Sequence, residues 1–145
     1  MSGGTWERTA SIVNNGNSNL TTYGSQIMAD LNNGGSTKYI TVYPHDSSKD
    51  NTSISNTDAN INTASQANYV KNTKIYGDGI RETSTAGTGT TSWYSDYSYF
   101  AGLYVPFFVR GGYYGYTSGA GLFCFYRHLG NSLYNSGFRS VLVSL

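Results

Sequence analysis

The chain of 145 residues contains a single cysteine, Cys124. One thiol excludes an internal disulfide framework and any metal site built from a cluster of cysteines. Cys124 lies in the apolar stretch Leu122-Phe123-Cys124-Phe125, which favours a small buried apolar residue. If Phe123 and Phe125 point inward on a strand, however, the Cys124 thiol points the opposite way, toward solvent or a second layer, and Cys124→Ser should change little.

Charge is also scarce, with 12% charged residues and a formal net charge of +1. This balance offers no steering toward phosphate backbones or acidic lipid, so nucleic acid is excluded as an expected partner. No stretch approaches the roughly 18 apolar residues that span a bilayer, and the N-terminus lacks a basic region followed by an apolar one. We therefore expect no membrane insertion and no signal peptide in this chain.

Glycine and tyrosine are abundant instead, at 18 and 14 residues, beside many Asn, Ser and Thr. This composition indicates a loop-rich β or α+β protein that works outside the reducing cytosol. The length suits a single domain over residues 1–145 with one core.

Local patterns predict short elements. We expect a strand over 5–13, a turn over 14–19, and a helix over about 22–32 that is capped by Thr21 or Thr22 and stopped by Gly34-Gly35. A strand over 39–43 should end at Pro44, followed by a weak helix over about 57–70 and a turn at 77–79. From Val105 onward we expect only antiparallel strands and tight turns.

No catalytic or metal constellation is visible. Asp46, Asp50 and Asp58 share a polar stretch over 45–62, but their spacing matches no calcium loop and no bidentate Glu follows, so we interpret the stretch as a solvated surface insertion. His45 and His128 are far apart in sequence, and no Ser or Cys is framed as a nucleophile. We expect no cofactor.

The tract from Tyr113 to Ser136 mixes tyrosines with Gly, Ser, Thr and Asn. This is the vocabulary of binding loops, where rigid amphipathic rings supply contact area at low entropic cost. A Tyr-rich antiparallel sheet packed for stability would produce the same composition.

Three motifs frame the chain: Met1-Ser2-Gly3-Gly4-Thr5-Trp6-Glu7, then Arg110-Gly111-Gly112, then Gly137-Phe138-Arg139. In this order they resemble the formylglycine-generating-enzyme-like branch of the C-type lectin fold. The resemblance implies an α+β, C-type-lectin-like fold with short helices, antiparallel strands and long loops.

Two subgroups of that family differ in function. The enzymes place a pair of cysteines after Arg-Gly-Gly to bind copper, whereas this chain has Tyr116 at the first position and only Cys124 in the region. The other subgroup comprises phage and bacterial ligand-binding proteins diversified by retroelements, whose Ala-Gly-x-Phe motif is similar to Ala120-Gly121-Leu122-Phe123.

Those retroelements randomise adenines, most often in Asn codons, and the resulting codons cannot encode Lys, Glu, Gln, Met or Trp. None of the five occurs from Gly111 to Leu145, whereas residues 1–110 contain them all. This absence supports the resemblance to the second subgroup.

The resemblance assigns a variable tract over 113–135. Its expected ligand-binding residues are Tyr113, Gly115, Tyr116, Ser118, Tyr126, Arg127, His128, Leu133, Tyr134 and Asn135, with Arg127 and His128 either ligand groups or merely solvated. The expected scaffold residues are Arg110, Gly111, Gly112, Ala120, Gly121, Phe123, Phe125, Gly137, Phe138 and Arg139, with both arginines as internal donors to carbonyls or carboxylates.

The resulting hypothesis is a non-enzymatic receptor-binding domain of a phage or prophage structural protein, on a virion or extracellular surface. Its Tyr-rich variable face would bind a bacterial surface protein or glycan, and its other partners would be virion proteins or further copies of itself. Two alternatives stay open: a purely structural, self-assembling virion or filament subunit, and, least favoured, a residual oxidase.

Overall fold

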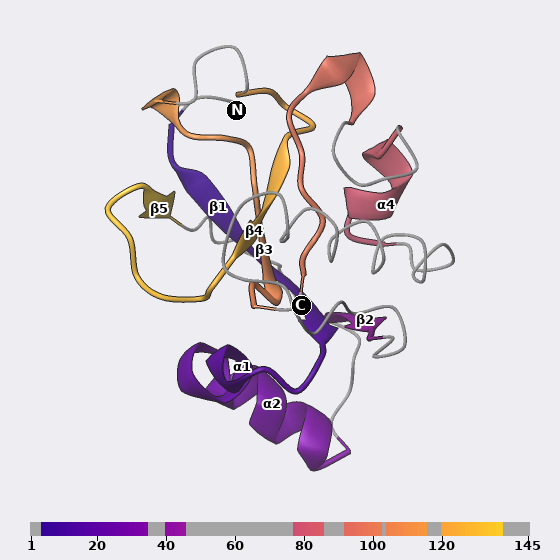
Figure 1. The fold of residues 1–145 in the computed structure, drawn as a ribbon, viewed down its shortest axis with the longest axis vertical. Helices are drawn as coiled ribbons and strands as arrows, with labels where there is room; N and C mark the ends of the chain where they lie inside the picture. Colours follow the sequence, from indigo (N-terminus) through magenta and orange to yellow (C-terminus); the bar gives the residue numbers. More distant parts are fainter. Residues whose placement is uncertain are drawn as a thin grey trace, which may run out of the picture.

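The computed structural model describes residues 4–34, 40–45, 77–85, 92–102, 104–115 and 120–137. Within these ranges the elements in chain order are β1 (Trp6–Asn14), α1 (Ser18–Tyr23), α2 (Ser25–Asn32), β2 (Thr41–Pro44), α4 (Ile80–Thr83), the 3₁₀ turn η3 (Trp93–Ser95), β3 (Phe107–Arg110), β4 (Phe125–His128) and β5 (Ser136–Gly137) (Figure 1). The predicted α+β class is confirmed, since short helices accompany one mixed sheet.

The five strands form a sheet in the order β2-β1-β3-β4, and β5 also pairs with β1. β3 runs antiparallel to both β1 and β4, as predicted for the chain from Val105 onward. β5 departs from that prediction because it runs parallel to β1, as β2 does. The connection from β4 passes from one edge of the sheet to the other, where β5 pairs with β1. No tight turn therefore joins β5 to its partner strand, and the two can run parallel.

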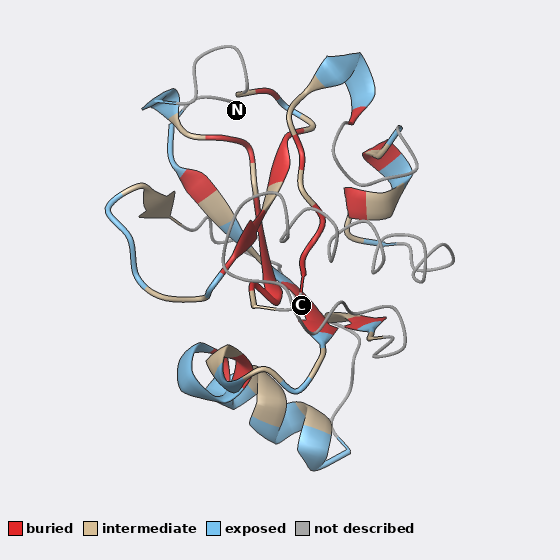
Figure 2. Ribbon diagram, viewed as in Figure 1, coloured by how far each residue is buried: buried red, intermediate tan, exposed pale blue. Residues whose placement is uncertain are grey.

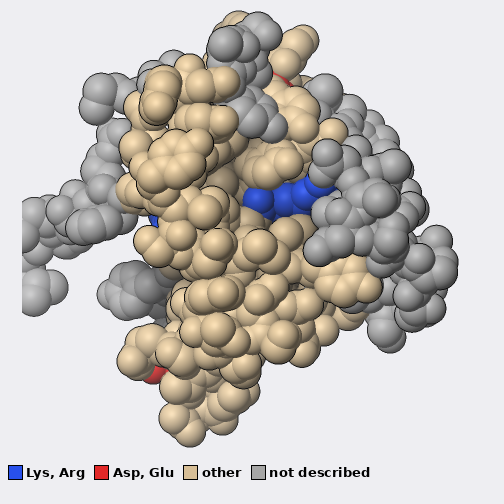
Figure 3. All heavy atoms as spheres, turned by 60° about the vertical axis from the view of Figure 1, so that its left-hand side comes forward, with Lys and Arg blue, Asp and Glu red and all other residues tan. Residues whose placement is uncertain are grey.

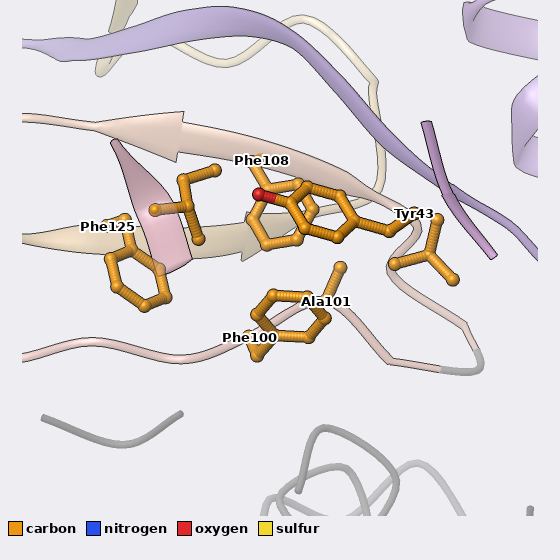
Figure 4. Packing of buried hydrophobic residues seen from close by; sticks show 7 residues of the cluster. Tyr43, Phe100, Ala101, Phe108 and Phe125 are labelled. Carbon is orange, nitrogen blue, oxygen red and sulfur yellow. The ribbon is translucent and has the colours of Figure 1, made fainter. Parts of the chain in front are cut away.

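Apolar side chains cover both faces of the sheet. Phe108 packs on one face, in a cluster completed by Val13, Tyr43, Ile80, Phe100, Ala101 and Phe125 (Figure 4). Its neighbours Phe107 and Val109 point to the other face, because successive strand residues alternate. Phe107 joins Ile12 and Leu20 there, while Val109 joins Trp6 and Cys124. Buried residues accordingly concentrate in β3, in β4 and in parts of β1 (Figure 2).

The predicted helix over 22–32 is in fact two helices. Gly24 separates α1 from α2, with a backbone conformation (φ −121°, ψ 29°) outside the helical range. The predicted caps are wrong: Asn17 caps α1, its side chain accepting the N–H of Asn19 at 2.9 Å. One side of α2 is apolar, and its Ile27, Met28 and Leu31 pack against the cluster of Ile12, Leu20 and Phe107.

The remaining local predictions divide between confirmed and undescribed parts of the chain. The turn at 77–79 is present and leads into the single helical turn α4. The weak helix over 57–70 and the polar stretch after His45 lie outside the described residues. Among the described helices, none has the length and apolar character needed to cross a bilayer.

Candidate ligand-binding face

The β4–β5 loop, residues 129–135, lies over the same side of the sheet as Trp6 and Arg8. The Arg8 guanidinium donates to the carbonyl of Gly130 at 2.8 Å and also to the carbonyl of Asn131. At the other end of the loop, the backbone N–H of Trp6 donates to the carbonyl of Asn135 at 2.8 Å. Both ends of the loop are therefore fastened to β1.

A cavity of about 290 Å³ lies between this loop and β4. The residues that line it are Val105, Tyr126, Arg127, His128, Leu129, Asn131 and Leu133. Four of them, Tyr126, Arg127, His128 and Leu133, belong to the ligand-binding set predicted from the sequence. The volume lies at the lower end of the range for small-molecule sites, so it suits a small ligand or one unit of a polymer.

His128 contributes a neutral ring to the cavity. Its Nδ1 accepts the N–H of Gly130 at 2.9 Å, which places the proton of the neutral imidazole on Nε2. Burial, with a smaller contribution from the Arg8 charge, lowers the pKa of His128 to about 4. The ring is therefore an uncharged N–H donor at neutral pH, and the alternative of a solvated histidine is wrong because the side chain is only 7% exposed.

Arg127 is buried as well, with 4% of its surface exposed, so it is not a solvated cation either. Its guanidinium carbon lies 4.6 Å from the centroid of the Tyr99 ring and 5.6 Å from that of Tyr126. Stacking on two aromatic rings stabilises a partly desolvated cation. The arginine thus links the cavity to the aromatic side chains beside it.

Those side chains form a continuous group, the aromatic row, consisting of Tyr114, Tyr113, Trp6, Tyr126, Tyr97 and Tyr99. Trp6 stacks on Tyr126 at a centroid distance of 5.7 Å, and the ring of Tyr113 lies 6.1 Å from that of Trp6 in a tilted arrangement. These separations lie in the range of favourable ring pairs. Trp6 is buried and Tyr114 is 71% exposed, so the row runs from the core to the surface.

The predicted ligand-binding residues fall into distinct environments. Tyr113, Tyr126 and Asn135 are half-buried, Arg127 and His128 are buried, and Gly115, Leu133 and Tyr134 are exposed. Tyr116 and Ser118 lie outside the described residues. Gly115 is tightly constrained despite its exposure, since a Cβ there would lie 2.6 Å from the ring of Tyr113.

Sequence reasoning missed several residues of this face. Trp6 belongs to a motif assigned to the frame, and its contact with Tyr126 joins strands that are distant in the chain. Tyr97 and Tyr99 carry a usable signal, because their spacing of two places both side chains on one side of an extended segment. Val105, Leu129 and Asn131 carry no signal of their own.

The predicted scaffold is partly confirmed. Arg110 is an internal donor, as expected, with its guanidinium 2.7 Å from the carbonyl oxygen of Asp78. Gly111 and Gly112 both adopt positive φ, at 85° and 63°, and a Cβ on Gly112 would lie 3.0 Å from the Cα of Ala120. The Gly-Gly pair therefore provides a bend of the backbone and a close approach to Ala120. Gly137 lies in β5, Phe125 is fully buried, and Phe138 and Arg139 lie outside the described residues.

Phe123 and Cys124 correct the expected pattern. Phe123 is half-buried rather than a core residue, and it packs against Trp93 at 5.2 Å and Tyr94 at 5.7 Å. Cys124 is fully buried in the second layer with Trp6. Desolvation in the first place, aided by the Asp96 charge, raises the pKa of its thiol to about 12. Cys124 is thus a protonated core residue, as its apolar neighbours indicated, and we now expect Cys124→Ser to destabilise the protein.

The face is poor in charge. Figure 3 brings forward the side that carries the β4–β5 loop, where basic atoms are visible mainly in one hollow and acidic atoms only as small spots. Within the described ranges, no group of three or more His, Cys, Asp or Glu is placed to hold a metal ion.

No protein-family model, no curated protein and no solved structure matches this chain.

Proposed function

We propose that this chain is a non-enzymatic ligand-binding domain that recognises a bacterial surface component through the cavity, the β4–β5 loop and the aromatic row. The observation that carries the proposal is the convergence of Tyr126, Arg127, His128 and Leu133 on one cavity beside a row of aromatic rings. Concave sites with apolar walls and a few polar groups are typical of ligand-binding sites.

The wider context follows the resemblance to the C-type lectin fold and to the retroelement-diversified proteins of phages and bacteria. In that context the domain belongs to a phage or prophage structural protein on a virion or extracellular surface. Several copies on one particle would raise the avidity of a modest single-site affinity, provided that their spacing lets them engage together.

The oxidase alternative is disfavoured by the chemistry of Cys124. A copper site of the enzyme subgroup needs two thiolates, whereas Cys124 is the single cysteine of the chain. Because burial holds its thiol protonated, it is a poor metal ligand and a poor nucleophile.

The self-assembly alternative has one observation in its favour. Trp93 and Tyr94 pack against Phe123 and are 46% and 88% exposed, and Leu122, the preceding residue in the chain, is 60% exposed. Exposed apolar groups of this kind mark interaction surfaces. Contact between copies through this group is compatible with ligand binding through the cavity, so the two functions need separate variants.

A retention assay tests the proposal. Labelled protein is incubated with cell envelopes from a panel of bacterial strains, and bound protein is compared for the wild type, a Leu133→Ser/Tyr134→Ser variant and a Tyr94→Ser variant. Tyr134 and Tyr94 are similarly exposed, at 84% and 88%, so Tyr94→Ser is the matched control. We expect the double variant to lose about 30-fold or more in affinity for envelopes that retain the wild type, since contact aromatics contribute roughly 2 kcal/mol or more.

Unchanged retention of the double variant would contradict the proposal. A loss confined to Tyr94→Ser, accompanied by a fall in the mass of the particle in solution, would support self-assembly instead.

A further inference from the structure

Among the described residues that line the cavity, His128 and Asn131 each have a buried polar atom without a hydrogen-bond partner in the described part of the chain: Nε2 of His128 and Oδ1 of Asn131. Buried polar atoms are nearly always paired, because an unpaired one loses its hydration without compensation. Both residues line the cavity, so a ligand in the cavity is the natural source of the missing partners. Within the β4–β5 loop, Arg8 holds the Asn131 backbone in place through its carbonyl.

The two atoms need opposite hydrogen-bond partners, since one is a donor and the other an acceptor. Nε2 of His128 carries the ring proton, since Nδ1 accepts the N–H of Gly130, and it therefore needs an acceptor. Oδ1 of Asn131 needs a donor. A ligand group that satisfies both must combine one acceptor and one donor.

The rest of the lining limits the group further. Val105, Leu129, Leu133 and the Tyr126 ring supply apolar walls, which favour a group ending in a methyl. Arg127 also lines the cavity, with its guanidinium stacked on the rings of Tyr99 and Tyr126. An anion such as a carboxylate is nevertheless disfavoured, because it has no donor for Oδ1 of Asn131 and would place negative charge beside this amide oxygen.

We propose that the cavity binds the acetamido group of an N-acetylamino sugar in a surface glycan. The acetamido carbonyl accepts from His128 Nε2, its N–H donates to Asn131 Oδ1, and its methyl group contacts the leucine side chains. The adjoining sugar ring packs against Tyr126 at one end of the cavity. This assignment rests on the proposed function, since it names the ligand class of the same site.

The buried position of both polar atoms has a consequence for entry. The atoms are closed to solvent, whereas Leu129 and Leu133 at the cavity are 40% and 41% exposed. For the acetamido group to reach the two buried atoms, we therefore expect these two side chains to move outward.

Titration followed by NMR of the ¹⁵N-labelled protein tests the assignment. The probes are a β-1,4-linked N-acetylglucosamine oligosaccharide, the corresponding glucose oligosaccharide, and N-acetylalanine methylamide as a peptide source of the same secondary amide. We expect the acetamido sugar to shift the Gly130 N–H signal and to bind at least tenfold more tightly than either other probe. Equal affinity for the glucose oligosaccharide, or tighter binding of the peptide amide, would overturn the assignment.

A matched pair of variants separates the two nitrogens of His128. His128→Asn keeps an acceptor near the Nδ1 position for Gly130 but lacks the Nε2 donor, and we expect it to lower affinity for the acetamido sugar about tenfold. His128→Gln offers a donor near the Nε2 position, and its affinity should stay within about threefold of wild type. If His128→Asn does not fold, Asn131→Ala removes the acceptor while leaving the backbone carbonyl that binds Arg8, and the same tenfold loss is expected.

Unchanged affinity in a folded His128→Asn or Asn131→Ala variant would overturn the assignment. The envelope assay keeps this failure separate from a failure of the proposed function. If the Leu133→Ser/Tyr134→Ser variant loses retention while the acetamido sugar does not bind, the face is a binding site for another ligand and only the acetamido assignment falls.

Discussion

The hydroxyl group of Tyr43 donates to the carboxylate of Asp78, lying 2.8 and 2.9 Å from its two oxygens. Tyr43 is fully buried on β2, and burial together with the negative charge of Asp78 raises the pKa of its hydroxyl. Asp78 in turn accepts the N–H of Ile80 at 2.9 Å and, through its backbone carbonyl, the guanidinium of Arg110. This one aspartate therefore connects β2, α4 and β3.

Tyr43→Phe should lower the free energy of unfolding by about 1–3 kcal/mol. The substitution leaves the ring packing against Phe100 and Phe108 in place but removes the donor to a partly buried carboxylate. Urea unfolding followed by circular dichroism measures the change, with Tyr134→Phe as a control at an exposed tyrosine. A midpoint for Tyr43→Phe equal to that of the control would show that Asp78 is satisfied without this hydroxyl.

The stability of the protein should fall as the pH drops from about 6.5 to about 4, in part because of His128. Its folded pKa of about 4 lies below the unfolded value of about 6.5, so the unfolded state binds the extra proton first. The contribution is fully present above pH 6.5 and is lost through this window, amounting to up to about 3 kcal/mol.

Comparison with His128→Gln isolates the contribution of His128 to the pH dependence of stability. Because the glutamine does not titrate, the stability difference between wild type and variant should shift steadily with pH between 6.5 and 4. Denaturant midpoints measured at several pH values give the slope. If stability changes with pH in the same way in both proteins, protonation of the His128 ring does not destabilise the folded state.

Cys124→Ser should destabilise the protein by about 1–3 kcal/mol, because it places a hydroxyl group in the apolar cluster of Trp6 and Val109. Cys124→Ala serves as the apolar comparison and should cost less. The native thiol should also react slowly with a disulfide reagent near pH 8, and rapidly once urea unfolds the chain. Fast native labelling would place Cys124 at the surface.

Gly121→Ala should disrupt the turn before β4. A Cβ at this position would overlap the carboxylate of Asp96, which accepts the N–H of Phe123 at 2.8 Å. Moving Asp96 breaks that bond, and we expect a loss of about 1–3 kcal/mol. The matched control is Gly4→Ala, where a Cβ meets nothing within 4 Å, and similar unfolding midpoints for the two variants would contradict the close approach.

Local sequence patterns predicted the elements whose cause is local. The strand at the N-terminus, the strand that ends at Pro44 and the antiparallel pair β3–β4 all follow from alternation and turn residues. The helix caps were missed because several polar residues compete for the cap, and the backbone at Asn17 decided between them. Phe123 was misplaced because it lies in a turn, where the alternation of a strand does not apply.

The candidate site was only half predictable for a related reason. The composition of the Tyr-rich tract, together with the family resemblance, predicted Tyr126 and Leu133 as ligand-binding residues, and both line the cavity. Trp6 and Arg8 come from the opposite end of the chain, and the pairing of β1 with β3 and β5 brings them to the same face. No local pattern reports such a long-range juxtaposition.

The attachment of the β4–β5 loop has a consequence for how this protein can change over generations. The loop groups through which β1 holds it are main-chain carbonyls, those of Gly130, Asn131 and Asn135. A carbonyl is supplied by every amino acid, so the side chains at 131 to 135 can be exchanged without undoing these bonds. Under the proposed function, single exchanges at these positions can therefore alter ligand recognition while the loop stays attached to β1.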